Sequence, residues 1–482
     1  MRRRPPNLLS SVTPWATKDD SSRVVLVAIL AAVACAFPGT ALAAEPAPPR
    51  PKLHSCDLGM PRPFECGHIM VPVRRGHPAL GETEVAFAIR HRRDRRQPSL
   101  GTIFAMDGGP GYASTAKPYA SSLIAALGPI LRRRDLVLYD MRGTGLSDAI
   151  DCPALQAGLI QESIAIDECA DQLGPSFAGY TSGEAADDMN QVRRALGLGK
   201  IFFYGDSYGT FFGQAYAVRY PGPLRGLILD SAYPGNDPYY RTLLPAGLHG
   251  LRLACRYSSS CSGNPVARLT RVVHAFHRAD RPTDSLIGFL LEAGTLAPRS
   301  YLSLDDGDRR FLTGEPRRLD RLLTPELGGE KLSEYSNGLA IAVECNDYRA
   351  LWDKSAPLSQ RIAEISALVK VLPRHFTAPF GRKEFILSPA TRLTSCLDWP
   401  APPAAGLPPA IPSDWKAPRS FPTLVTSGQV DDVTSVREAH EVAARFPRSS
   451  LYVVPDRGHV SSLYFPFRSP EVGVIRKFIA SH

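Results

Sequence analysis

The chain has 482 residues, of which 44% are hydrophobic and 21% charged, so it can bury a large core and is too long for one small domain. Its formal net charge is +9. The basic residues are scattered in short groups without aromatic interleaving or an RNA-binding signature, which argues against nucleic acid as a partner. We interpret them as a solvated surface.

The first 43 residues have the pattern of a secretory signal peptide. A basic leader precedes the apolar stretch 24–37, which is too short to span a bilayer comfortably, and Ala41 and Ala43 fit a small-residue cleavage site. We expect cleavage after Ala43 and no stable membrane association of the mature chain. An uncleaved membrane anchor is the alternative, because the leader is long. Lipid attachment at Cys35 is disfavoured, because Ala32 stands where that pattern normally has leucine.

The cysteines indicate disulfides. Of nine cysteines, all but Cys35 lie after the predicted cleavage site, and an oxidising compartment favours their pairing. Many pairings are possible, and none of the spacings is that of a zinc site. Nearness along the chain favours Cys56 with Cys66, Cys152 with Cys169, Cys255 with Cys261, and Cys345 with Cys396.

Predicted strands alternate with predicted helices in the first half of the chain. Runs of β-forming residues predict strands within 68–75, 84–93, 102–106, 135–140, 200–205 and 225–230. A capping residue, early acids and a closing glycine predict a helix within 181–199, and another begins at Tyr208. Apolar strands that alternate with helices are typical of a mostly parallel sheet with helices on both faces, so the predicted class is α/β.

This alternation stops after residue 234 and returns near residue 421. The segment between mixes helix-like pieces such as 266–279 with irregular, proline-rich connections. Strands within 422–428 and 450–455 and helices within 435–446 and 471–480 then follow. We therefore divide the chain into a signal peptide (1–43), the first part of an α/β core (44–234), a large inserted cap (235–420) and the second part of the core (421–482).

A serine stands between two glycines at a predicted strand-to-helix turn. Gly205-Asp206-Ser207-Tyr208-Gly209 fits the pattern Gly-x-Ser-x-Gly, in which the glycines permit a sharp turn that exposes the serine hydroxyl above the sheet. A glycine-rich turn with a capping serine is the alternative interpretation. A catalytic serine needs a base and an acid, so the rest of the sequence decides between the two.

An acid and a histidine follow Ser207 in the required order. Asp431 comes after a late strand and His459 after the last one, which is the order of the α/β-hydrolase triad. We assign Asp431 as the acid and expect Asp432 to be solvent-facing or capping. Asp230 is a weaker candidate, because it also fits an ordinary strand end. His459 as a plain loop histidine is the alternative.

The oxyanion of an acyl-transfer reaction requires fixed N–H donors. The amide of Tyr208 follows the predicted nucleophile directly, and the second donor should come from the loop Asp-Gly-Gly-Pro-Gly after an early strand. Pro110 has no N–H, which leaves Gly108, Gly109 or Gly111. We favour Gly109. An ordinary tight turn is the alternative interpretation of this loop.

These motifs together resemble the secreted tripeptidyl aminopeptidases, which are α/β-hydrolases related to prolyl iminopeptidases. The resemblance extends from about Cys66 to the C-terminus. The matching segments are GGPG at 108–111, YDMRGTGLSD at 139–148, YGDSYGT at 204–210, VECND at 343–347, SCLDW at 395–399, SGQVDDVT at 427–434 and GH at 458–459.

The resemblance implies a secreted or cell-envelope bacterial serine exopeptidase, which removes single residues or short peptides from a free N-terminus through an acyl-enzyme. Related enzymes bind the substrate ammonium with a glutamate in or near the cap, and Glu344 is the candidate here; a surface helix carboxylate is the alternative. The chemistry needs no metal or organic cofactor. Two departures, Asp107 and Asp206, put carboxylates beside the site. We expect the triad to survive them, whereas they leave the substrate preference less well defined.

Two other classes of function remain open. A secreted esterase or other acyl hydrolase would use the same triad, and a cap pocket without an ammonium-binding acid would favour it. A catalytically silent binding protein is disfavoured by the intact triad and donor loop. Arg142 and Asp148, in the turn after a strand, are interpreted as structural partners.

Overall fold

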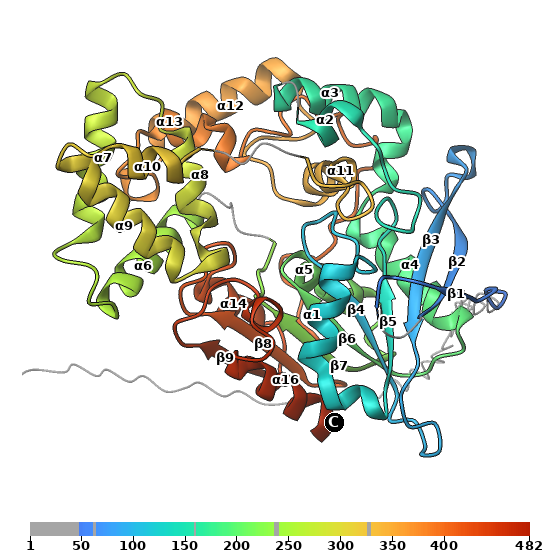
Figure 1. Ribbon diagram of the computed structural model, residues 1–482. Helices are drawn as coiled ribbons and strands as arrows, with labels where there is room; N and C mark the ends of the chain where they lie inside the picture. The colour runs from blue at the N-terminus through green and yellow to red at the C-terminus, as the bar shows by residue number, and fades with distance from the viewer. Residues whose placement is uncertain (1–47, 61–63, 159–160, 236–240, 325–328) are drawn as a thin grey trace, which may run out of the picture. The chain divides into compact units, whose positions relative to one another are not determined.

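The computed structural model describes residues 48–482 except 61–63, 159–160, 236–240 and 325–328 (Figure 1). The predicted signal peptide and its cleavage site lie outside the described residues. Among the residues described, no helix combines the length and the apolar composition that crossing a membrane requires.

The core is a nine-stranded sheet with the order β1-β2-β3-β5-β4-β6-β7-β8-β9. The N-terminal strands pair antiparallel as far as the β3–β5 contact, and all pairs from β5–β4 to β8–β9 are parallel. Every predicted strand is present, and the predicted α/β-hydrolase fold is confirmed. The strands are β1 (His54–Cys56), β2 (Phe64–Pro72), β3 (Glu82–Arg90), β4 (Thr102–Met106), β5 (Asp135–Tyr139), β6 (Ile201–Asp206), β7 (Leu224–Asp230), β8 (Thr423–Gly428) and β9 (Ser449–Val454).

Helices cover both faces of this sheet (Figure 1). One face packs on α4 (Ser182–Ala195), α5 (Tyr208–Arg219) and α14 (Val436–Ala443), and the other on α1 (Lys117–Leu127) and α16 (Pro470–Ser481). The predicted helix within 181–199 begins as expected, because the Thr181 side chain accepts a hydrogen bond from the N–H of Glu184. The α2 (Pro153–Ala157), α3 (Glu162–Leu173) and α15 (Ser461–Tyr464) helices complete this part.

Between β7 and β8 the described residues form helices and no strand of the sheet. Most of these helices share a hydrophobic core of their own, to which Leu251, Val273, Leu290 and Phe385 belong. One of them, α11, instead buries Leu339 against the core of the sheet. The helices are α6 (Leu243–Arg256), α7 (Pro265–Arg278), α8 (Asp284–Glu292), α9 (Arg299–Leu312), α10 (Arg317–Leu322), α11 (Asn337–Asp347), α12 (Leu358–Val371) and α13 (Arg382–Leu387). The domain boundaries at 235 and 420 stay a prediction.

The four disulfides are those that nearness along the chain favours. They join Cys56 to Cys66, Cys152 to Cys169, Cys255 to Cys261, and Cys345 to Cys396. The last of them spans 51 residues and fixes α11 to the segment that precedes β8. It therefore constrains α11, which lines the same cavity as Ser207.

Arg142 and Asp148 are structural, as expected. The buried guanidinium of Arg142 donates to both oxygens of Asp188 on α4, at 2.6 and 2.7 Å. Asp148 accepts hydrogen bonds from Thr83 Oγ1 and from the N–H of Glu84. These contacts fix the turn after β5 to α4 and β3.

Replacing Asp188 with alanine should destabilise the fold strongly. The change removes both carboxylate hydrogen bonds of the fully buried Arg142 and leaves Glu184, at 3.8 Å, as its nearest carboxylate. Breaking a buried ion pair in this way typically costs about 3–5 kcal/mol of unfolding free energy. Urea denaturation followed by tryptophan fluorescence measures the difference. Asp306→Ala is the control, because Asp306 is partly exposed and pairs only with arginines near the surface, so its loss should cost about 1 kcal/mol or less. Equal losses for the two variants would contradict this account.

Candidate active site

Ser207 occupies a strained turn between β6 and α5. Its φ is 49° and its ψ is −120°, in a region that residues other than glycine rarely adopt. The flanking glycines are required by space, because a Cβ on Gly205 would lie 2.1 Å from the carbonyl oxygen of Gly209, and a Cβ on Gly209 would lie 2.6 Å from that of Met106. The Ser207 N–H donates to the carbonyl of Asp230 at 2.9 Å. The turn therefore has the geometry of a nucleophile elbow.

His459 contacts the predicted acid. Its Nδ1 lies 3.0 Å from Oδ2 of Asp431, and both residues are buried. Oδ1 of Asp431 accepts the N–H groups of Val433 and Thr434 at 3.0 and 2.9 Å, which fix the carboxylate. His459 and Ser207 line the same cavity, which has a volume of about 1500 Å³. Of the three predicted triad residues, His459 and Asp431 are thus in contact, and His459 shares the cavity wall with Ser207.

Thr434 contacts both Asp431 and His459, which the sequence did not predict. Its Oγ1 donates to Oδ2 of Asp431 at 3.0 Å and lies 3.2 Å from Nδ1 of His459. A threonine three residues after an aspartate commonly makes a local turn contact, so the spacing alone gave no reason to connect it with the histidine. Its hydroxyl restrains the acid and the imidazole together.

Asp432 differs from the expectation that it faces solvent. It is buried, and its Oδ1 accepts the N–H of Gly294 at 2.7 Å, in the 3₁₀ turn η5 (Ala293–Leu296) of the inserted segment. Burial raises the pKa of Asp432 well above its usual range. The carbonyl of Gly294 in turn accepts the N–H of His459 at 3.0 Å. The alternative expectation, a capping role toward backbone, is therefore the correct one.

The weaker acid candidate, Asp230, is used elsewhere. Its carboxylate accepts hydrogen bonds from Tyr204 Oη at 2.7 Å and Thr426 Oγ1 at 3.0 Å, and from the hydroxyl of Ser462. Asp230 therefore supports the turn through its carbonyl and the sheet through its side chain.

The loop after β4 lies directly against Ser207. A Cβ on Gly108 would lie 2.7 Å from Cβ of Ser207, so only glycine permits this approach. The N–H of Gly108 already donates to Oδ1 of Asp107 at 2.7 Å. Within the described ranges, the N–H of Gly109 makes no such hydrogen bond. Tyr208 is the first residue of α5, whose N–H has no intrahelical acceptor. These facts argue against Gly108 and are compatible with Gly109 and Tyr208 as the two donors.

Glu344 lies on α11 and lines the cavity, but it is ion-paired. Its Oε2 accepts a hydrogen bond from Nη2 of Arg392 at 3.2 Å, and Nη1 of Arg392 lies 3.6 Å from Oε1 of Glu162. Burial raises the pKa of Glu344, and Arg392 opposes that rise. The sequence did not reveal this pair, because 48 residues separate the partners. The disulfide between Cys345 and Cys396 holds their two segments together.

Other carboxylates also line the cavity. Glu292, at the end of α8, is exposed to the cavity, and no ion pair of its side chain occurs within the described part of the chain. The surrounding cavity wall still removes part of the water around its carboxyl group, which raises the pKa of Glu292, and the charge of Arg392 opposes that rise. Glu330 accepts a hydrogen bond from the hydroxyl of Tyr112 at 3.0 Å. The cavity wall is therefore acidic at more than one place.

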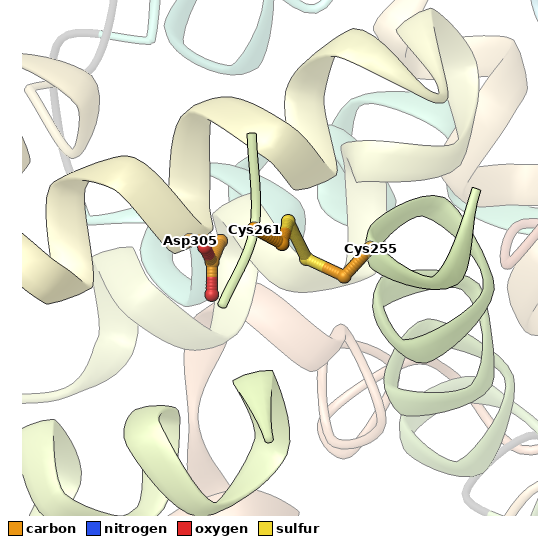
Figure 2. Close-up of side chains that lie close together, drawn as sticks. All are labelled: Cys255, Cys261 and Asp305. Carbon is orange, nitrogen blue, oxygen red and sulfur yellow. A yellow bond between two sulfur atoms is a disulfide. The ribbon is translucent and has the colours of Figure 1, made fainter. Parts of the chain in front are cut away.

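A group of possible metal ligands lies in the inserted segment, away from Ser207. Cys255, Cys261 and Asp305 come close together, as Figure 2 shows. Both sulfur atoms belong to one disulfide and are not thiolates, which are the form that binds metals. Arg268 donates to Oδ1 of Asp305 at 2.9 Å. The chemistry of this group is therefore that of a structural bridge beside an ion pair.

Comparison with known proteins agrees with this geometry. One family model, described as alpha/beta hydrolase fold, matches residues 103–262, which include Ser207. A second, described as TAP-like protein, matches residues 386–465, which include Asp431 and His459. The chain has the α/β-hydrolase fold. The two matches lie on either side of most of the inserted segment, as expected of a hydrolase core that is split in sequence.

Curated relatives of this α/β-hydrolase include peptidases. Serine protease Hip1 of Mycobacterium tuberculosis is 25% identical over 445 residues, which cover 80% of each chain. The tripeptidyl aminopeptidase of Streptomyces coelicolor is 26% identical over 204 residues, 38% of each chain. Carboxylesterase B of M. tuberculosis is 30% identical over 339 residues, 61% of each chain. The resemblance to tripeptidyl aminopeptidases is confirmed, and the protein is a serine hydrolase.

Changing Ser207 to alanine should abolish turnover and leave the fold intact. The glycines that shape the elbow remain, and only a hydroxyl at the cavity surface is lost, so the rate should fall by at least about a thousandfold. Hydrolysis of a chromogenic substrate measures the rate, and circular dichroism checks the fold. Near-normal turnover of the variant would exclude Ser207 as the nucleophile.

The two neighbouring aspartates should behave differently. Asp431→Asn should lower kcat by about a thousandfold or more with little change in KM, because it disturbs the orientation of His459 and not the pocket. Asp432→Asn should cost less than tenfold, because the amide oxygen still accepts the Gly294 N–H. Asp432→Ala should cost more than Asp432→Asn, since it removes that acceptor. A larger loss for Asp432→Asn than for Asp431→Asn would assign the acid to the neighbouring residue.

Proposed function

We propose that the protein is an exported serine exopeptidase that hydrolyses peptide bonds near the free N-terminus of its substrates. The observation that carries this proposal is the cavity of about 1500 Å³, because Ser207 and His459 line it together with Glu292 and Glu344. The nucleophile and base fit a substrate with a carbonyl group to attack. The carboxylates elsewhere in the same wall fit a substrate that also carries an ammonium group.

The proposed chemistry is an acyl transfer through Ser207. His459 takes the hydroxyl proton through Nε2 while Oγ attacks the substrate carbonyl carbon, and the N–H groups of Gly109 and Tyr208 stabilise the oxyanion. The protonated imidazole then gives its proton to the leaving amine, which departs. Water, activated by the same imidazole, hydrolyses the acyl-enzyme. Asp431 fixes the imidazole and stabilises its charge at each step, and its contact of 3.0 Å with Nδ1 supports this role.

The cavity supports removal of more than one residue at a time. Its volume of about 1500 Å³ exceeds that of ordinary small-molecule sites, which is roughly 300–1000 Å³. A tripeptide in extended form reaches about 10 Å from the scissile bond to its ammonium, so the anchor has to lie away from Ser207. A substrate of this length agrees with the name of one relative, the tripeptidyl aminopeptidase.

For the ammonium we propose Glu344, with Glu292 as the second candidate. Both carboxylates line the cavity, and an ammonium–carboxylate hydrogen bond is charge-assisted. Arg392 competes with the substrate for Glu344 through the 3.2 Å contact. An ammonium that binds there either shares the carboxylate with Arg392 or displaces it, which makes the Glu344–Arg392 pair the natural point to test.

Export rests on the predicted signal peptide and on the disulfides. Four disulfides in one chain fit an oxidising compartment outside the cytoplasm. The curated relatives named above come from bacteria. We therefore propose a secreted or cell-envelope bacterial enzyme.

An acyl hydrolase for esters is the second candidate. It is favoured by the ion pair between Glu344 and Arg392, which leaves that carboxylate already compensated, and by the relative named carboxylesterase B. Apolar side chains in the wall, among them Phe289, Leu351 and Trp352, would also accept an acyl chain. The nucleophile is the same in both cases, so only the substrate distinguishes them.

Variants of Glu344 and Arg392 should separate the two functions. If Glu344 binds the ammonium, Glu344→Gln removes a contact worth about 1.5–3 kcal/mol, and kcat/KM for a free tripeptidyl amide falls by about one to two powers of ten. The N-acetylated peptide and a short neutral ester, which carry no ammonium, should hardly respond. Arg392→Gln should leave kcat/KM for the free peptide unchanged or raise it, because the competing cation is gone.

The controls decide what a loss means. Equal losses on free and acetylated peptides for both variants would assign the ion pair a purely structural role. A selective loss for Glu292→Gln, but not for Glu344→Gln, would move the anchor to α8. If the unmodified enzyme cleaves acetylated and free peptides equally well, the exopeptidase function fails, and the ester hydrolase takes its place.

A further inference from the structure

Two aspartates lie side by side next to the elbow. In the parallel pair of β4 and β6, Met106 is opposite Gly205, so the next residues, Asp107 and Asp206, lie at the carboxyl ends of these neighbouring strands. The two carboxyl groups act directly on each other, and both residues line the cavity. Oδ1 of Asp206 is buried and makes no hydrogen bond within the part of the chain described. Neither residue belongs to the Ser207–His459–Asp431 triad.

The surroundings of this pair hold acids and tyrosines. The groups that act on it are Tyr119 from α1, Asp140 after β5, Asp230 at the end of β7, Glu330 from the inserted segment, and Tyr464 from α15. None of these groups supplies a positive charge. Burial, with the charges of Asp140 and Glu330, raises the pKa of Asp107 to about 7. Burial, with the charges of Asp107 and Asp230, raises the pKa of Asp206 well above its usual range. Two such carboxyl groups retain a shared proton where isolated carboxylates have none.

The pair is connected to both sides of the reaction centre. Oδ1 of Asp107 accepts the N–H of Gly108 at 2.7 Å, and the N–H of Asp107 donates to Ser114 Oγ at 3.0 Å. Gly108 is the residue whose backbone lies against Ser207. Asp206 directly precedes Ser207 in the chain. A displacement of either carboxyl group would therefore move the donor loop relative to the nucleophile.

We propose that Asp107 and Asp206 form a proton-sharing pair that positions the loop of Gly108 and Gly109 against Ser207, and that loss of the shared proton ends activity in alkaline solution. This inference rests on the proposed roles of Ser207 and of the loop. In the working state one carboxylate accepts the Gly108 N–H and the hydroxyl of its protonated neighbour. When hydroxide removes that last proton to form water, two negative charges lie in contact beside the oxyanion, which they disfavour. Both aspartates are positioning residues.

The test is the pH dependence of covalent labelling by a neutral fluorophosphonate. This probe reacts with an activated serine and has no ammonium, so titration of a substrate does not contribute. For the unmodified enzyme, the labelling rate should rise as His459 loses its proton, and should fall again at alkaline pH. Asp206→Asn cannot form the doubly charged state, while its amide still donates to Asp107. Its alkaline fall should move up by at least about one pH unit, with a rate at neutral pH within about threefold.

Two further variants guard against a loss of folding. Asp107→Asn retains an acceptor for the Gly108 N–H and also prevents the double charge, so it should show the same shift. Asp107→Ala removes that acceptor and should lower the rate about tenfold or more at every pH. Asp308→Asn is the matched control, because Asp308 is a buried aspartate of α9 with a raised pKa, and it does not line the cavity. Its carboxylate oxygens make no hydrogen bond to any residue that the structure describes. The profile of Asp308→Asn should match that of the unmodified enzyme.

The outcomes separate the inference from the proposed function. If the unmodified enzyme is labelled and its rate stays level up to pH 10, or if both asparagine variants keep its profile, the role of the pair is overturned and the serine hydrolase stands. An equal shift in Asp308→Asn would likewise overturn it, since the effect would then not be local. If Ser207 is not labelled at any pH, the proposed nucleophile and the inference fail together.

Discussion

The close backbone contact between the end of β4 and the β6–α5 turn is the constraint on which the site depends. Glycine is the only residue that fits at 108, 205 and 209, because a Cβ at any of these positions would lie less than 3 Å from a neighbouring atom. The contact brings the donor loop to Ser207 and holds the serine at positive φ. The cost of that strained backbone is of order 1–3 kcal/mol, which the buried strands around it have to offset. Because the elbow already has this conformation, its backbone does not have to reorganise during the reaction.

A second set of contacts joins the second half of the core to the inserted segment. Asp431 contacts His459 within the second half, while Asp432 and His459 both bind the backbone of Gly294 in the insertion. The two neighbouring aspartates thus have different partners. Asp431 contacts the imidazole of His459, and Asp432 binds the Gly294 turn, which also accepts the backbone N–H of His459. Close packing also explains why residue 458 is a glycine, because a Cβ there would lie 1.7 Å from the Gly294 carbonyl oxygen.

Much of this arrangement follows from local sequence. The strands, the α4 and α5 helices and the position of Ser207 depend on residues that are neighbours in the chain, and three of the four disulfides join cysteines no more than 17 residues apart. The Glu344–Arg392 pair, the Thr434–His459 contact and the Asp107–Asp206 pair depend instead on which segments the fold brings together. A pattern of residues shows the type of side chain at such places, but not its partner. Asp432 illustrates this, because an acid in a loop is usually exposed, and here another segment buries it.

The hydrogen bonds at Gly294 restrict how substrate reaches the cavity. The N–H of Gly294 is held by Asp432, and its carbonyl holds His459, so this turn is a fixed point shared by the insertion and the core. A rigid swing of the whole insertion about a distant hinge would pull the imidazole out of line with Asp431. Entry and exit therefore have to occur through movements that leave η5 in place, in helices farther along the insertion. Changes of specificity by remodelling those helices are compatible with an intact contact between His459 and Asp431, whereas deletion or exchange of the insertion as a unit removes the backbone acceptor of His459.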